Sequence, residues 1–574
     1  MCYKLIRTIE ELEAIKLNKE LPLFADTETC EELGKTTPKG GLYGKVRLLQ
    51  IYQKGWKKAL LIDCYFIPLA LVLEKIKAFR HVYHNATYDL STINCHTTET
   101  WLPVEVEDTF YMSKDKYPEK QKFGFYECLN HAGLEDETIK GIDKKANQTA
   151  DWSKQLTTTM LKYAAYDVLY LSLLWEKVKD ARSESYTLDI ANLKYAIHYD
   201  RKGLPMNRET IAEIRIEQML KLEKAQEFVP VNINSPKQCK EWLGLNSTDA
   251  DTLAHEALRG NEKAGHLKRA RQAYKILGFI DKYDRPVMKA FHNAAGARTG
   301  RFTCSGGHRY GYDNLQNPPR AIYKAMEAPK GYKLVYSDYS GLELRLVAAY
   351  IDETKLVELF KQGVDVHTKT GAFLFDCNEE DLPEQQRWAG KMCSFVSIYG
   401  GGAATIAGIM EKQGSAKVDL KEVIEMKRKW LEFYPVIKEW HRMSGKMMQV
   451  YGYIDTMSLL GRSIRATTFM EAHNYPIQAA GAEVIKKALE YLHSYDEDPD
   501  VANVVHDAIT LIKKEGPEAE LWGTRLNESM LKGWDYVIAR SAVPSMPMVC
   551  DVVVSSVQGV TDGNDNYNYG VSTL

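Results

Sequence analysis

Apolar runs that end in charged residues mark the strands and helices of this chain that carry candidate chemistry. The stretch LPLFADTET is an apolar run that ends in Asp26 and Glu28, and it predicts a strand. Residues two apart in a strand point to the same face, so these two carboxylates should project together. An Asp-x-Glu pair is also common on solvated surfaces, so the pair alone leaves a metal site and a plain surface open.

Two segments with helical spacing add oxygen ligands to this pair. In VYHNATYDL, Asn85 and Asp89 stand four apart at a predicted helix start, and in YAAYDVLYLSLL, Tyr163 and Asp167 stand four apart in a helical pattern. An i, i+4 pair shares one helix face. Hard divalent cations prefer oxygen ligands, and two of them about 3.5–4 Å apart can activate a water that cleaves a phosphodiester.

Together these residues resemble the signature of 3′ to 5′ proofreading exonucleases, which is Asp-Glu-Asp-Asp with a tyrosine four residues before the last aspartate. The matching residues are Asp26, Glu28, Asp89, Tyr163 and Asp167. In that family the tyrosine orients the attacking water. Taken singly, the tyrosine would fit a packed core aromatic equally well; within the complete set, an active nuclease is the expectation.

Polar and basic segments follow in the middle of the chain. The region from about 185 to 290 is largely helical by pattern, with a turn at Asn-Ser-Pro before an amphipathic run. The stretch HLKRARQAYKILGFIDKY carries Lys268, Arg271 and Lys275, which fit a solvated helix face and a grip on a phosphate backbone equally well. ARTGRFTCSG and NLQNPPR place Arg301 and Gln316 where they could hydrogen-bond sugar edges and minor-groove acceptors.

Two aspartates at predicted strand ends suggest a second metal site. In YKLVYSDYSGLELRLVAAY, a strand is predicted up to Ser337, with Asp338 at its end and Glu343 in the helix that follows. In VANVVHDAITLI, Asp507 interrupts an apolar segment, where an ionised carboxylate needs a cation to offset its charge. Asp338 and Asp507 could bridge two metal ions, one at a primer 3′ hydroxyl and one at a triphosphate.

The stretch RWAGKMCSFVSIYGGGA spaces Arg387, Lys391, Phe395 and Tyr399 four apart. On a helix these residues form a slowly winding stripe, charged at one end and aromatic at the other. The stripe could hold phosphates and face sugar and base, although taken alone it would favour an amphipathic helix with Phe395 and Tyr399 in the core. The glycines 400–402 are predicted to end the helix and to let it swing.

In order and spacing, these motifs resemble family A DNA polymerases, the class that contains bacterial polymerase I and many phage replicases. The polymerase motifs are DYSGLELR, R-x3-K-x3-F-x3-YG and VHD, accompanied by DVHTKTG, YGYIDTMSLLGRSIR and NYPIQAAGAEVIKKA. The resemblance implies a multidomain α/β and α+β chain, with a ribonuclease H-like exonuclease domain and a right-hand polymerase. The implied boundaries are 1–182 for the exonuclease, 183–292 for the thumb, 293–358 and 456–574 for the palm, and 359–455 for the fingers.

The resemblance also implies roles for single residues. Asp338 and Asp507 become the metal-binding catalytic pair, and Glu343 becomes the steric gate that crowds a ribose 2′ hydroxyl. Phe395 stands where family members with Phe discriminate against dideoxynucleotides, and Tyr399 stacks near the template base. The residues implied to contact the incoming triphosphate are His367, Arg387 and Lys391. Those implied to touch the primer-template around the nascent pair are Arg301, Asn474, Gln478 and His506.

The chain departs from the family pattern in two places. Ala508 stands where the third motif usually has Glu, which removes a carboxylate near the primer end. Glu483, in QAAGAE, is a milder variation. Both bridging aspartates remain, so we expect synthesis to survive. We expect no 5′ nuclease domain before the exonuclease, and a compact chain of this kind resembles phage replicative enzymes.

Composition sets only broad limits. The 574 residues allow about four domains, and a net charge of −2 neither indicates nor excludes a local positive groove. No run approaches the ~20 apolar residues of a membrane span, and the N-terminus does not read as a signal peptide. The 10 cysteines include no C-x-x-C pair, which favours reduced thiols in a reducing compartment, so a cytoplasmic location is expected. The resemblance implies that this is the cytoplasm of a bacterial cell or phage-infected host.

The expected function is template-directed extension of a primer by two-metal phosphoryl transfer, with 3′ to 5′ proofreading, for phage-type DNA replication. The expected cofactor is Mg²⁺, two per active site, with Mn²⁺ as a substitute. Expected partners are primer-template DNA, dNTPs and an unidentified replisome helicase, primase or processivity factor, with no membrane. Two alternatives stay open: a DNA-binding or repair-accessory protein whose synthesis site has decayed, which Ala508 favours, and a single-subunit RNA polymerase, against which Glu343 speaks.

Overall fold

A computed structural model describes residues 1–30, 44–148, 150–305, 313–412 and 419–558. The chain forms two compact units, each built from stretches that are distant in sequence. Unit 1 comprises Met1–Gly203, Lys289–Tyr312 and Leu460–Arg465, and unit 2 comprises Leu204–Met288, Asp313–Leu459 and Ala466–Leu574. Among the described residues, every helix is too short or too polar to span a lipid bilayer.

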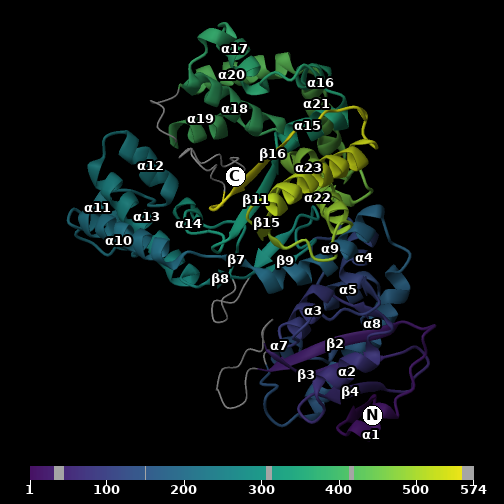
Figure 1. Ribbon diagram of the computed structural model, residues 1–574. Helices are drawn as coiled ribbons and strands as arrows, with labels where there is room; N and C mark the ends of the chain where they lie inside the picture. Colours follow the sequence, from purple (N-terminus) through teal and green to yellow (C-terminus); the bar gives the residue numbers. More distant parts are fainter. Residues whose placement is uncertain (31–43, 149, 306–312, 413–418, 559–574) are drawn as a thin grey trace. The chain divides into compact units, whose positions relative to one another are not determined.

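Unit 1 contains a mixed six-stranded sheet with the strand order β1-β4-β3-β2-β5-β6 (Figure 1). Strand β2 (Leu23–Cys30) lies inside the sheet, antiparallel to β3 (Lys45–Tyr52) and parallel to β5 (Arg80–Tyr83). The other strands of the sheet are β1 (Tyr3–Ile6), β4 (Ala59–Asp63) and β6 (Glu105–Asp108). The predicted strand around Asp26 and Glu28 is therefore confirmed as β2.

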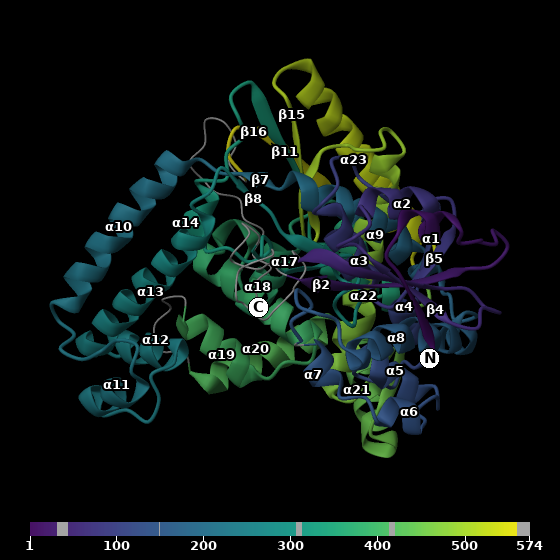
Figure 2. The same ribbon diagram turned by 90° about the horizontal axis from the view of Figure 1, so that it is seen from below.

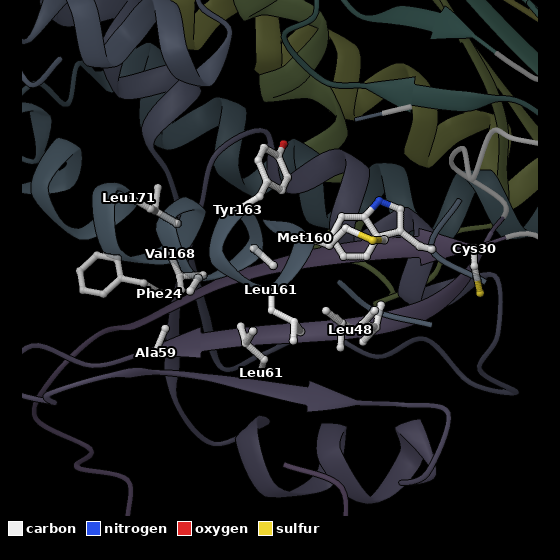
Figure 3. Close-up of a cluster of buried hydrophobic side chains, with 14 of the residues drawn as sticks. Phe24, Cys30, Leu48, Ala59, Leu61, Met160, Leu161, Tyr163, Val168 and Leu171 are labelled. Atoms are coloured by element: carbon white, nitrogen blue, oxygen red, sulfur yellow. The ribbon is translucent and has the colours of Figure 1, made fainter. Parts of the chain in front are cut away.

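Helix α8 (Thr158–Val178) packs on this sheet. Its first turn is capped by Thr157, whose side chain accepts a hydrogen bond from the Met160 N–H. Its apolar face joins side chains from β2, β3 and β4 in one buried cluster, while the Tyr163 hydroxyl points away from that cluster (Figure 3). Each fully buried aliphatic side chain contributes about 1.5–3 kcal/mol, so the cluster fixes α8, and with it Tyr163, against β2.

Shorter helices and a hairpin complete unit 1. Strands β9 (Phe291–Asn293) and β10 (Thr303–Ser305) pair antiparallel and lie against α9. The helices are α1 (Ile9–Glu13), α2 (Leu69–Ile76), α3 (Ala86–Asn94), α4 (Thr109–Lys116), α5 (Phe125–His131), α6 (Glu137–Lys140), α7 (Lys144–Gln148) and α9 (Glu184–Lys202).

Unit 2 is built around an antiparallel sheet with the strand order β14-β15-β11-β16. Helices α22 (Phe469–His493) and α23 (Pro517–Ile538) pack against each other, and α23 also covers β11 and β16. The strands are β11 (Tyr332–Tyr339), β14 (Val501–Val505), β15 (Ala508–Lys514) and β16 (Cys550–Ser555). The predicted strand that leads to Asp338 is thus β11.

The predicted helical region from about 185 to 290 is confirmed. Within unit 2, α10 (Arg208–Gln226) and α13 (Glu262–Tyr283) lie side by side (Figures 1 and 2). The predicted turn at Asn-Ser-Pro is the start of α11 (Pro236–Leu243), where Ser235 caps the helix and Pro236 fills its first position. Helix α12 (Ala250–Leu258) follows and packs on α13.

In a second group of helices in unit 2, α18 packs on α17, α19 and α20 (Figure 2). The group comprises α16 (Thr354–Lys361), α17 (Val366–Leu374), α18 (Glu384–Ile398), α19 (Ala403–Lys412), α20 (Leu420–Phe433) and α21 (Pro435–Tyr451). The remaining described elements of the chain are α14 (Arg320–Tyr323), α15 (Leu342–Ile351), β7 (Leu204–Pro205), β8 (Val287–Met288), β12 (Ile454–Met457) and β13 (Ser463–Ala466), with a 3₁₀ turn at Glu379–Asp381.

Candidate functional site

Three carboxylates of unit 1 converge. Asp26, Glu28 and Asp167 each place a carboxylate oxygen within 4.8 Å of the others. The first two project from β2, and Asp167 comes from α8. The fourth predicted carboxylate, Asp89 on α3, accepts a hydrogen bond from the Thr27 hydroxyl at 2.7 Å. This all-oxygen donor set is the kind that Mg²⁺ and Mn²⁺ prefer.

Burial and mutual repulsion make this cluster costly to ionise. Burial raises the pKa of Asp26 to about 7. The pKa of Glu28 is raised well above its usual value, first by burial and then by the charges of Asp26, Asp167 and Asp89. A bound cation would offset this accumulated negative charge, so the cluster fits a metal site better than an empty solvated surface.

Asn85 does not lie where its spacing predicts. It precedes the first residue of α3 in the left-handed conformation, with φ at 67°, so it shares no helix face with Asp89. Asparagine tolerates this backbone region better than most residues, which explains how the chain turns into the helix at this point. The predicted pairing of Asn85 with Asp89 on one face is therefore wrong.

Asp338 and Asp507 of unit 2 lie on neighbouring strands. Strands β14 and β15 are joined by the two-residue turn of His506 and Asp507, because Val505 pairs directly with Ala508. His506 adopts a φ of 52°, as such tight hairpin turns require. In the adjacent ladder Asp338 pairs with Ala508, which brings the predicted aspartates side by side.

The surroundings of Asp338 also fit a cation. Burial, followed by repulsion from and hydrogen bonding with Asp507, raises the pKa of Asp338 to about 8. Its Oδ1 atom is buried and has no hydrogen-bond partner among the described residues. On the other side of β11, Asp338 pairs with Asp551 of β16, a carboxylate that no sequence motif indicated. Asp551 therefore flanks Asp338 on the side of β11 opposite Ala508.

The predicted stripe from Arg387 to Phe395 lies on α18, and Tyr399 forms the C-terminal cap of that helix. The Tyr399 hydroxyl donates a hydrogen bond to Oε2 of Glu343, which lies in the first turn of α15. Gly400 follows with a φ of 80°, so the glycines end the helix as predicted. The predicted aromatic end of the stripe thus contacts the predicted gate residue directly.

The charged end of the stripe meets α17. Nη2 of Arg387 lies 2.6 Å from Oδ2 of Asp365, the residue that caps α17 by accepting the His367 N–H. The rings of His367 and Phe395 lie 5.9 Å apart, and the Lys391 ammonium lies 5.8 Å from the Phe395 ring centre. Burial, and then the nearby Lys391 charge, lower the pKa of His367 to about 4. Sequence reasoning missed Asp365, although DVHTKTG contains it.

The predicted DNA-contacting residues fall in several places. Gln316 is buried and donates to the Val504 carbonyl at 3.2 Å, while Asn474 and Gln478 lie one turn apart on α22. Arg301 belongs to unit 1. Lys268 lies half-buried on α13, and Arg271 donates to the Ile233 carbonyl at 2.7 Å and to the Thr248 carbonyl. The Arg271 guanidinium therefore links two loops through hydrogen bonds to their backbone carbonyls.

Lys275 instead lines a groove of about 980 Å³ in unit 2. Most of the groove's basic residues come from α10, α13 and α14. They are Lys221, Lys224, Arg269, Lys275, Arg320 and Lys324. Sequence reasoning missed Lys221, Lys224 and Lys324; the i, i+3 spacing of the first two on α10 was the available signal.

Known DNA polymerases are similar to this chain in sequence. DNA polymerase I of Aquifex aeolicus (strain VF5) is 26% identical over 568 residues, which cover 90% of this chain and 93% of that protein. DNA polymerase I of Bacillus caldotenax is 29% identical over 377 residues, or 58% of this chain. The chain spans only 41% of the Bacillus protein and 46% of the matching Rhizobium leguminosarum protein.

A solved structure shares the fold. It is described as the POL domain of Pol1 from M. smegmatis in complex with DNA primer-template and dNTP. It matches with a TM-score of 0.72 at 18% identity, over 94% of this chain and 95% of that chain. The model of DNA polymerase family A matches residues 206–552. Because this match covers more than half of the sequence and contains Asp338, Arg387 and Asp507, the chain belongs to DNA polymerase family A.

Proposed function

We propose that the protein is a DNA-directed DNA polymerase that extends the 3′ end of a primer with dNTPs. The observation that carries this proposal is the ladder pairing of Asp338 with Ala508, which sets Asp338 beside Asp507. In this proposal the two aspartates hold two Mg²⁺ ions, for which Mn²⁺ can substitute. Bound metal ions would supply charge neutralisation at the primer hydroxyl and the triphosphate.

The residues around α18 then act on the incoming nucleotide. Arg387 and Lys391 neutralise the phosphates, with His367 beside them. Phe395 and Tyr399 face the sugar and the base. Glu343 occupies the space that a ribose 2′ hydroxyl would need, which selects deoxyribonucleotides. The hydrogen bond from the Tyr399 hydroxyl to Glu343 supports a gate that is held in place before substrate arrives.

Primer-template DNA is the proposed partner. The basic groove of α10, α13 and α14 suits a phosphate backbone, because six basic residues line it together with apolar residues such as Phe228 and Phe279. Asn474, Gln478, His506, Gln316 and Arg301 are proposed to contact the duplex near the nascent pair. A replisome helicase, primase or processivity factor and a phage-type replicative role remain part of this proposal, while the relatives named above are bacterial polymerases.

We further propose that unit 1 is a ribonuclease H-like 3′ to 5′ proofreading exonuclease. The convergence of Asp26, Glu28 and Asp167 supports this activity, with Asp89 as the fourth carboxylate. Tyr163 would orient the attacking water from α8, one turn before Asp167. Since the donors are all carboxylates and a phenol, Mg²⁺ or Mn²⁺ fits this site as well.

One assay tests both activities. A labelled primer is incubated on its template with Mg²⁺; its 3′ end is mismatched for digestion without dNTPs and fully paired for extension with dNTPs. We expect Asp507→Asn to abolish extension and to leave digestion intact, and Asp89→Ala to abolish digestion and to leave extension intact. Synthesis by the Asp507→Asn protein would show that the polymerase metal assignment is wrong, and digestion by the Asp89→Ala protein would show the same for the nuclease.

The same assay separates the alternatives. If the Asp89→Ala protein extends no primer with dNTPs, the synthesis site has decayed and the chain acts as a nuclease or DNA-binding protein. If it prefers ribonucleotides, it is an RNA polymerase. Ala508 is the one feature that favours a decayed site, and the adjacent Asp338 and Asp507 speak against it.

A further inference from the structure

Two tyrosines lie near the Asp167 carboxylate in the cluster of unit 1. Tyr163, from the signature, lies one turn before Asp167 on α8. Tyr126, from the first turn of α5, donates from its hydroxyl to Oδ1 of Asp167 at 3.4 Å. Tyr126 belongs to no motif of the sequence, yet it lines the same cavity of about 590 Å³ as Asp26, Glu28 and Tyr163.

The aromatic ring of Tyr126 is contacted by a lysine. The Lys144 ammonium, at the start of α7, lies 4.9 Å from the centre of the Tyr126 ring. A cation at this distance from an aromatic face is attracted by the ring quadrupole. The Lys144 ammonium is in turn 3.5 Å from Oε2 of Glu127, the residue next to Tyr126. The Tyr126 ring is thus contacted by a cation and its hydroxyl by a carboxylate.

Such an arrangement restricts how Asp167 can turn. A carboxylate whose one oxygen accepts a fixed hydrogen bond presents its other oxygen in a set direction. Groups that orient metal-binding side chains in this way commonly change metal affinity about 10–100-fold when they are removed. In the proposed nuclease the Tyr163 hydroxyl orients the attacking water, which leaves Tyr126 to orient the Asp167 carboxylate.

We propose that Tyr126 is a positioning residue of the exonuclease site, which holds the Asp167 carboxylate in the orientation that binds metal, and that Lys144 holds Tyr126. This inference rests on the proposed exonuclease function of unit 1. In this proposal the Tyr163 hydroxyl orients the attacking water, and the Tyr126 hydroxyl orients the metal-binding Asp167 carboxylate.

Direct metal binding tests the proposal without any turnover. The full chain carrying Asp338→Asn and Asp507→Asn, which silences the proposed polymerase site, is titrated with Mn²⁺, and free Mn²⁺ is followed by electron paramagnetic resonance. We expect Tyr126→Phe to weaken Mn²⁺ binding about tenfold. Lys144→Met should weaken it in the same direction by a smaller factor. In the otherwise unaltered protein, the Mg²⁺ concentration for half-maximal digestion of single-stranded DNA should rise in parallel.

Two controls separate this inference from the proposed function. Tyr170→Phe removes another phenol of α8 that donates to an aspartate, Asp136, outside the cluster, and it should leave Mn²⁺ affinity unchanged. Asp167→Asn should abolish binding at this site. Unchanged affinity in Tyr126→Phe, with binding lost in Asp167→Asn, overturns the positioning role and leaves the exonuclease standing. Unchanged binding and digestion in Asp167→Asn overturn the exonuclease site itself.

Discussion

The guanidinium of Arg387 is paired with the carboxylate of Asp365, with Nη2 and Oδ2 2.6 Å apart. Arg387 is also proposed to bind the incoming triphosphate. The triphosphate therefore competes with the Asp365 carboxylate for the Arg387 guanidinium. Both side chains are partly exposed, 32% for Arg387 and 42% for Asp365. The pair therefore falls in the range of exposed ion pairs, which contribute about 0.2–1 kcal/mol.

Asp365→Asn should consequently strengthen dNTP binding. Asparagine keeps the helix cap of α17, because its side-chain oxygen also accepts backbone N–H groups, but it releases the charge of Arg387. We expect the KM for dNTP to fall by a factor of up to about five, with kcat little changed. Asp376→Asn removes an equal charge that is paired with Lys429 and should leave KM unaltered. A rise in KM would mean that Asp365 aids triphosphate binding.

Glu343→Ala should admit ribonucleotides, because it empties the space proposed to exclude the 2′ hydroxyl. We expect the preference for dNTP over rNTP in single-nucleotide extension to fall by at least about tenfold. Tyr399→Phe is the matched variant, since it removes the hydrogen bond to Glu343 and keeps the carboxylate. If selectivity depends on bulk, Tyr399→Phe retains most of it; an unchanged preference in Glu343→Ala would remove the gate hypothesis.

Gly400→Ala should destabilise unit 2. A methyl group at this position would lie 2.3 Å from Cε1 of Phe469, on a backbone with a φ of 80° that disfavours side chains. We expect the free energy of unfolding to fall by about 1–3 kcal/mol, measured by urea denaturation. Gly402→Ala meets no atom within 4 Å and should be close to neutral. Equal stability of the two variants would show that the contact with Phe469 relaxes freely.

Without metal, the nuclease cluster should oppose folding increasingly as pH rises. The pKa of Asp26 is about 7 in the folded protein against 3.8 for an ordinary aspartate, so the folded state binds the proton more tightly than the unfolded state. Tighter proton binding by Asp26 in the folded state adds to the free energy of unfolding in full below about pH 4, and this gain is lost as pH rises through 7. In EDTA, Asp26→Asn should raise Tm over wild type by an amount that grows from pH 4 to pH 8. A difference that does not change with pH would contradict this assignment.

Local patterns in the sequence were sufficient where one element supplies the geometry. The two-residue spacing of Asp26 and Glu28 predicts a shared strand face, and the structure brings both to Asp167. The interval of four from Arg387 to Phe395 predicts one helix, and α18 contains them. In both cases the period of a single strand or helix decides where the side chains point.

Periodic patterns in the sequence could not predict contacts between elements that are distant along the chain. Asp551 faces Asp338 through the register of β11 and β16, and no periodicity in either strand encodes that register. Asp365 meets Arg387 through the packing of α17 on α18. Arg271 belonged to a charge run that allowed two interpretations, and only its bonds to the Ile233 and Thr248 carbonyls reveal a brace between loops. The roles of these residues in substrate binding remain predictions.

The division of unit 1 among three stretches of chain affects how the protein is made. The ribosome releases Met1–Gly203 long before Lys289–Tyr312, and Leu460–Arg465 comes later still. The surface of the nascent unit that receives the β9–β10 hairpin therefore stays uncovered until more than half of the polypeptide has been translated. A fragment cut after Gly203 would keep its carboxylates but lack this cover, which makes it a poor choice for expressing the nuclease alone.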